Sequence, residues 1–125
     1  TDWFRAYSAA VDAGVSAVIV TQFKRSHETG APLAQARGLT PIERPVTTNA
    51  DAYAIALAQE LRTAHAGRTV LVVGHSNTVP AIVAAVSGKR VGPIADERYG
   101  DVFVVVTPRG GEPRLMRLRV EGPWE

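Results

Sequence analysis

The feature that most constrains the fold of this chain is an apolar segment that ends abruptly at a glycine and a histidine. Residues 69–73 (TVLVV) are strand-forming throughout, and Gly74 and His75 follow them directly. An uninterrupted apolar run is typical of a central parallel strand that is covered on both faces. Polar residues 76–78 and Pro80 then suit the start of a helix. The segment therefore predicts a strand, a sharp turn and a helix, with His75 at the carboxyl end of the strand.

The position of His75, at the end of a strand and beside the start of a helix, favours the binding of an anion. In open α/β sheets, ligands bind beyond the carboxyl ends of the strands. The start of a helix also offers backbone N–H groups to a phosphate. We therefore expect His75 and the backbone N–H groups near Ser76 and Asn77 to form a phosphate-binding edge.

Strands and helices alternate along the rest of the chain. Helices are expected over residues 2–13, after residue 21 as far as Gly38 with Pro32 either bending or restarting it, over 50–65 behind an Asn49 cap, and over 79–86. Strands are expected at 15–21, 41–46 (a short edge strand), 69–73, 101–108 and 114–120, and the last two form a hairpin at a sheet edge. This order predicts a three-layer α/β/α fold with a mostly parallel sheet.

Length and composition limit the class of protein. The chain has 125 residues, 46% hydrophobic and 21% charged, which suits one domain over residues 1–125. A net charge of +2 without a basic stripe argues against nucleic-acid binding. The absence of cysteine excludes disulfides and thiol catalysis, and no apolar run reaches the ~20 residues of a membrane helix. We expect a cytoplasmic protein that does not bind a membrane.

A second strand-to-helix junction carries Arg25. It follows the strand at residues 15–21, as His75 follows residues 69–73, so both side chains should stand at the same edge of the sheet. A guanidinium fork and an imidazole beside a helix start suit the oxygens of a phosphoryl group. The alternative, that Arg25 is a solvated helix residue and His75 a turn residue, stays open on spacing alone.

The other histidines and the serine offer less. We expect His65 to lie at a helix end. His27 lies two residues after Arg25 and could reach the same rim, but an exposed helix face is the favoured position. No pair of histidines has the spacing of a metal site, so no metal or cofactor is expected. The sequence around Ser76 is close to a nucleophile elbow. However, Thr78 stands where that motif has glycine, and no histidine follows the serine, which argues against a serine hydrolase.

Two segments together resemble the histidine phosphatase superfamily, which has the phosphoglycerate-mutase-like fold. Residues 18–34 contain Thr21, Arg25 and Thr29 in the spacing of the family's phosphate-binding arginine motif, and residues 71–80 contain a Gly-His like that of its second active-site histidine. A further likeness at residues 99–105 extends the resemblance to nearly the whole chain, from about residue 9 to residue 120.

The departures from the family are also informative. The family's Arg-His-Gly, which carries the nucleophilic histidine on a first strand in the middle of the sheet, is absent. Without that strand two sheet edges would be left unpaired, at about 1–3 kcal/mol for each buried group without a partner. We therefore expect a domain that is incomplete at its amino end, with the nucleophile upstream of Thr1, or a homodimer whose partner chain supplies the strand. Ser76 excludes one of the family's positions for a carboxylate proton donor, and Glu43 and Asp51 are conceivable for the other.

The resemblance implies a phosphoric monoester hydrolase that acts through a phosphohistidine. Its substrate would be a small phosphorylated metabolite or a phosphoprotein, and phosphate or sulfate should bind in the same place. Arg25 and His75 would be catalytic and, together with Ser76 and Asn77, phosphate-binding. The sequence leaves mutase and phosphatase activity open, although the short chain favours a phosphatase. The alternative is a non-catalytic phosphate-binding or regulatory module of the same fold.

Overall fold

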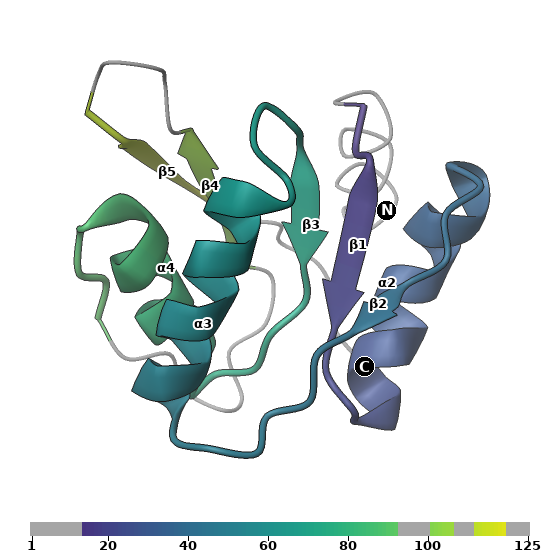
Figure 1. Ribbon diagram of the computed structural model, residues 1–125, viewed down its shortest axis with the longest axis horizontal. Helices are drawn as coiled ribbons and strands as arrows, with labels where there is room; N and C mark the ends of the chain where they lie inside the picture. The colour runs from purple at the N-terminus through teal and green to yellow at the C-terminus, as the bar shows by residue number, and fades with distance from the viewer. Residues whose placement is uncertain (1–13, 93–100, 107–111, 120–125) are drawn as a thin grey trace.

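Three parallel strands form the centre of the computed structural model, which describes residues 14–92, 101–106 and 112–119 (Figure 1). The strands are β1 (Ala17–Val20), β2 (Ile42–Glu43) and β3 (Val70–Val72), in the order β2-β1-β3. β2 pairs with β1 through Ile19 and Ile42, and β3 pairs with it from Ala17 opposite Val70 to Ile19 opposite Val72. The short edge strand expected within residues 41–46 is thus confirmed as the two-residue β2.

Helices cover both faces of this sheet. The helices are α2 (Lys24–Ala36), α3 (Ala50–Thr63) and α4 (Val79–Ser87). On one face, Val18 and Val20 of β1 pack with Leu33 and Ala34 of α2. On the other face, Ile19 packs with a cluster from α3 and α4: Tyr53, Ala54, Leu57 and Ile82. Successive residues of a strand point to opposite faces, so β1 is buried by helices on both sides (Figure 1). The predicted α/β class with a parallel sheet is confirmed.

The strand at the centre of the sheet is not the one that the sequence indicated. Residues 69–73 predicted a central strand, but β3 is the edge of the three-stranded sheet in the described part of the chain, and Val70–Val72 are half-buried. β1 is central instead, and all four of its residues are buried. Both segments are apolar and β-branched, and such a run indicates that a strand has covered faces without saying how many neighbours it has.

The two last strands form a separate sheet. β4 (Asp101–Val106) and β5 (Arg114–Arg119) are antiparallel, with Asp101 opposite Arg119 and Val106 opposite Arg114. The predicted hairpin is therefore confirmed, but its place at the edge of the parallel sheet is not, because β3 and β4 are not hydrogen-bonded to each other. The expected helix over residues 2–13 and most of the loop before residue 101 lie outside the described residues.

Local sequence accounts for the helix boundaries. The Asn49 side chain accepts a hydrogen bond of 2.8 Å from the Ala52 N–H, so the predicted cap of α3 is confirmed. α2 continues through Pro32, which excludes the predicted restart of that helix. Gly30 lets α2 approach the sheet, because a Cβ at that position would lie 3.0 Å from Val20 and 3.1 Å from Val18.

No helix in the described ranges is long and apolar enough to span a membrane. In the same ranges, no three histidine, aspartate or glutamate side chains gather in a way that could hold a metal ion.

Candidate functional site

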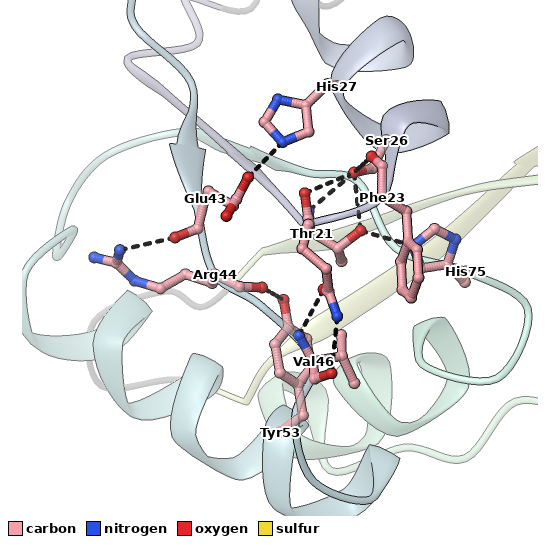
Figure 2. A network of polar contacts seen from close by, with 10 residues as sticks. Thr21, Phe23, Ser26, His27, Glu43, Arg44, Val46, Tyr53 and His75 are labelled. Carbon is pink, nitrogen blue, oxygen red and sulfur yellow. Dashed lines mark hydrogen bonds and ion pairs between the residues drawn. The ribbon is translucent and has the colours of Figure 1, made fainter.

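The two strand-to-helix junctions meet at one edge of the sheet. β1 and β3 are adjacent and parallel, and the Val73 N–H donates to the Ile19 carbonyl at 2.9 Å, so the residues that follow each strand emerge side by side. Thr21 follows β1, and its hydroxyl oxygen lies 2.8 Å from Nε2 of His75 (Figure 2). The structure therefore brings together two segments that are 54 residues apart in the sequence.

Thr78 fixes the turn that presents His75. Its hydroxyl accepts a 2.9 Å hydrogen bond from the His75 N–H, and the side chain is buried. The N–H groups of Thr78 and Val79 donate to the His75 carbonyl at 3.0 and 2.9 Å. Thr78 occupies the N-cap position of α4, but its hydroxyl does not cap the helix and bonds back to His75 instead. Ser76 and Asn77 lie in this turn, directly before the first residues of α4.

Gly74 is required by the close approach of this turn to the strand. A Cβ at position 74 would lie 2.9 Å from Oγ1 of Thr78 and 2.9 Å from a methyl group of Val79. Contacts this short force the neighbouring atoms to move. Gly74 therefore allows Thr78 to reach the backbone of His75.

A chain of hydroxyl groups sets the orientation of the His75 ring. The Thr21 hydroxyl donates to Oγ of Ser26 at 2.8 Å, and the Ser26 hydroxyl donates to the carbonyls of Phe23 and Thr21 at 2.9 and 3.0 Å (Figure 2). Because the single proton of Thr21 points to Ser26, Nε2 of His75 is the donor in the contact with Thr21. Any contact between the ring and a ligand must then come from Nδ1.

The electrostatic surroundings of His75 favour its neutral form. Burial lowers the pKa of His75 below its usual value of 6.5, and the positive charge of Arg25 lowers it further. Both effects disfavour an imidazolium.

The other residues predicted for the site lie in α2 and in the turn before α4. Arg25 is in the first turn of α2 and is exposed, so its guanidinium can meet a ligand from solvent. Ser76 is half-buried and Asn77 exposed, both in the turn before α4. Thr29, part of the motif that resembles the family, donates its hydroxyl to the Arg25 carbonyl at 2.8 Å within α2.

The structure adds residues that the sequence did not single out. Ser26 and Thr78 are buried hydroxyl residues that orient His75 through Thr21 and through the backbone. The exposed Phe23 ring lies edge-to-face with the His75 ring, with centroids 5.3 Å apart and an interplanar angle of 87°. The contact between Thr21 and Ser26 joins two hydroxyl residues five positions apart, on either side of the end of β1. That short spacing is the sequence feature from which this contact could have been inferred.

The candidate proton donors lie on either side of the loop after β2. Glu43 accepts a 2.8 Å hydrogen bond from Nε2 of His27, and both side chains are half-exposed (Figure 2). His27 was expected on an exposed face of its helix, and it lies in α2 with its side chain 42% exposed. Asp51 is exposed in the first turn of α3, where a negative charge suits the helix dipole. His65 lies near the end of α3, 3.6 Å from Glu60, so its predicted structural position is confirmed.

Polar contacts hold that loop against the junction after β1. The Gln22 side chain accepts from the Val46 N–H at 2.8 Å and donates to the Val46 carbonyl at 3.0 Å. The Tyr53 hydroxyl donates to the Arg44 carbonyl at 3.0 Å (Figure 2). Arg44 in turn forms a two-point ion pair with Glu60, at 2.8 and 3.1 Å. The rim of the site is therefore fixed by hydrogen bonds to β2, α3 and the loop between them.

Comparison of the chain with protein-family models, with curated proteins and with solved structures gives no match.

Proposed function

We propose that this chain binds the phosphoryl group of a phosphate monoester and is a phosphoric monoester hydrolase of the histidine phosphatase type. The observation that carries the proposal is that the two strand-to-helix junctions, which carry Arg25 and His75, meet at the carboxyl edge of two adjacent parallel strands. The bond of 2.8 Å from His75 to the buried Thr21 supports it, because a ring held in one orientation suits binding of an oriented ligand.

Each group has a distinct part in the proposed site. The guanidinium of Arg25 is exposed and can form a fork of two hydrogen bonds to phosphoryl oxygens. The N–H groups of Ser76 and Asn77, at the start of α4, donate to a third oxygen. His75 presents Nδ1, because Nε2 is bonded to Thr21.

Proton balance determines how His75 meets the phosphate. The neutral ring carries a lone pair on Nδ1, which accepts a proton from a phosphoryl OH, whereas the protonated ring donates an N–H to a phosphoryl oxygen. Since the pKa of His75 is lowered by burial and then by Arg25, the empty site holds the neutral ring at neutral pH. A phosphate dianion stabilises the protonated ring, so binding is expected to raise this pKa.

In the proposed hydrolysis, a nucleophilic imidazole nitrogen attacks phosphorus in line with the ester bond. The P–O bond to the leaving alcohol breaks as the P–N bond forms, and a carboxylic acid protonates the leaving oxygen. Water then attacks the phosphohistidine, releasing phosphate and the free imidazole. We propose that the nucleophile is a histidine outside the 125 residues, because the three histidines of the sequence all lie in the described ranges, His27 bonds to Glu43 and His65 lies near Glu60.

The second candidate is a non-catalytic phosphate-binding module. It is favoured by the partners of the other two histidines in the described part of the chain, since His27 bonds to Glu43 and His65 lies 3.6 Å from Glu60. Both candidates use the same phosphate site, and they differ in whether bound ester is cleaved.

Phosphate titration followed by NMR tests the binding that both candidates share. Phosphate should shift the His75 ring signals, and Arg25→Ala should weaken binding about 10- to 100-fold, the range of charged hydrogen bonds. Lys24→Ala is the matched control: Lys24 is the neighbouring exposed cation and forms an ion pair with Glu28 at 3.6 Å. Equal loss in both variants would reject a specific role for Arg25 and leave only nonspecific attraction.

Hydrolysis of p-nitrophenyl phosphate, measured on protein that includes the segment proposed to carry the nucleophile, separates the two candidates. Activity that His75→Ala abolishes and His27→Ala retains supports the hydrolase. Phosphate binding without cleavage supports the binding module. Activity that survives His75→Ala unchanged would reject the proposed site.

A further inference from the structure

An exposed aromatic ring stands at the rim of the proposed phosphate site. Phe23 is 50% exposed, although it sits in the fixed segment between β1 and α2. Its carbonyl accepts hydrogen bonds from the N–H and the hydroxyl of Ser26, at 3.1 and 2.9 Å, so its backbone is held in place. The Phe23 ring is therefore exposed although its backbone is held by hydrogen bonds.

Phe23 also occupies a position that helix chemistry assigns to another kind of residue. It is the N-cap of α2, where serine, threonine, asparagine or aspartate would satisfy a free backbone N–H, and its side chain makes no cap hydrogen bond. A position that disagrees with both burial and capping preferences is expected where function requires the residue. The Phe23 ring lies against the ring of His75, which places it at the proposed phosphate site (Figure 2).

We infer that Phe23 binds the organic part of the ester, and that this part is an aromatic ring bonded directly to the ester oxygen. The inference rests on the proposed function. The Phe23 and His75 ring centroids are 5.3 Å apart, so a phosphoryl group at His75 places its ester substituent beside Phe23. Aromatic pairs gain from offset or edge-to-face contact beyond the area that they bury.

The surroundings of Phe23 favour an aryl ester over a polar one. The side chain that precedes it, Gln22, is already bonded at both ends to Val46, and the two that follow, Lys24 and Arg25, are cations. Among these four consecutive residues, Phe23 supplies the exposed apolar side chain. An aryl group one bond beyond the ester oxygen reaches it, whereas an aromatic base separated from the phosphate by a sugar extends past it.

Binding of two stable phosphonates tests this inference without requiring catalysis. Phenylphosphonate and methylphosphonate share the phosphoryl group and differ in the ring, and NMR of the full chain gives both dissociation constants. The expected result is about three- to tenfold tighter binding of phenylphosphonate. This preference for phenylphosphonate over methylphosphonate should disappear in Phe23→Ala and persist in Phe23→Tyr. The matched control is Ile55→Ala, another exposed apolar residue, on α3, which should keep the preference.

The possible results distinguish failure of the aryl assignment from failure of the phosphate site. Equal binding of the two phosphonates to the wild type, or a preference that survives Phe23→Ala, would overturn the aryl assignment and leave the phosphate site intact. If neither phosphonate shifts the His75 signals, the phosphate site itself is overturned. A short peptide that carries a phosphonate analogue of phosphotyrosine distinguishes the sources of the aryl group: tighter binding than phenylphosphonate assigns a protein substrate, and weaker binding a small ester.

Discussion

Replacing Thr21 with valine should release His75 while preserving the shape of the core. Thr21 is fully buried, and its hydroxyl bonds to both Nε2 of His75 and Oγ of Ser26 at 2.8 Å. Losing a hydrogen bond costs about 0.5–1.5 kcal/mol, and more where the partner is left buried and unsatisfied. Ser26 keeps its bond from the Thr21 N–H, and half-buried His75 partly regains water, so we expect a loss of about 1–2 kcal/mol.

Urea unfolding followed by circular dichroism measures this loss, and NMR reports on the imidazole. In the variant, Nε2 loses its fixed acceptor, so the ring should populate both neutral tautomers. Phosphate affinity should fall about three- to tenfold, equivalent to roughly 0.6–1.4 kcal/mol of positioning. Thr29→Val is the matched control, because that exposed hydroxyl bonds within its own helix; it should change stability by less than about 0.5 kcal/mol. Equal effects of the two substitutions, or an unchanged tautomer in Thr21→Val, would refute the argument that Thr21 orients His75.

Three further predictions concern the frame of the site. Gly74→Ala places a Cβ within 2.9 Å of two neighbouring atoms and should cost about 1–3 kcal/mol in urea unfolding, whereas Gly92→Ala, with open space around it, should cost less than about 0.5 kcal/mol. Glu60→Gln should cost less than about 1 kcal/mol at pH 7, since its partner Arg44 is exposed. The hydrogen bond from Arg44 lowers the pKa of Glu60 below 4.5, so this contribution is complete above pH 4.5 and disappears as the pH falls through the lower value; unfolding measured across pH 2–7 checks it. Asn49→Ala should cost about 1 kcal/mol by removing the cap of α3, and an unchanged unfolding midpoint would contradict it.

The sequence predicted the parts of the site that depend on chain-local rules. Alternation of apolar strands and helices placed Arg25 and His75 after two parallel strands, and parallel strands end at a common edge. The cap at Asn49 and the turn glycine at position 74 could likewise be predicted from the sequence, because each depends on backbone chemistry within a few residues.

Contacts between distant segments could not be predicted in the same way. Nothing in a local pattern indicates that Thr21 bonds to His75, or that His27 bonds to Glu43, because these pairs form only after the strands and helices are packed. The central position of β1 was missed for a related reason. Apolar composition reports on the faces of a strand, whereas its order in the sheet depends on which edges pair.

The way in which His75 is held determines the charge of the proposed site. A carboxylate at Nε2 would stabilise the imidazolium and raise the pKa, whereas the neutral hydroxyl of Thr21 orients the ring without adding a negative charge. Burial and the charge of Arg25 then lower the pKa, so the empty site carries the charge of Arg25 next to a neutral imidazole. An arriving phosphate reverses the balance, because its negative charge favours protonation at Nδ1. In the proposed site, the second positive group thus forms when the ligand is bound, and two adjacent cations need not be maintained in the empty protein.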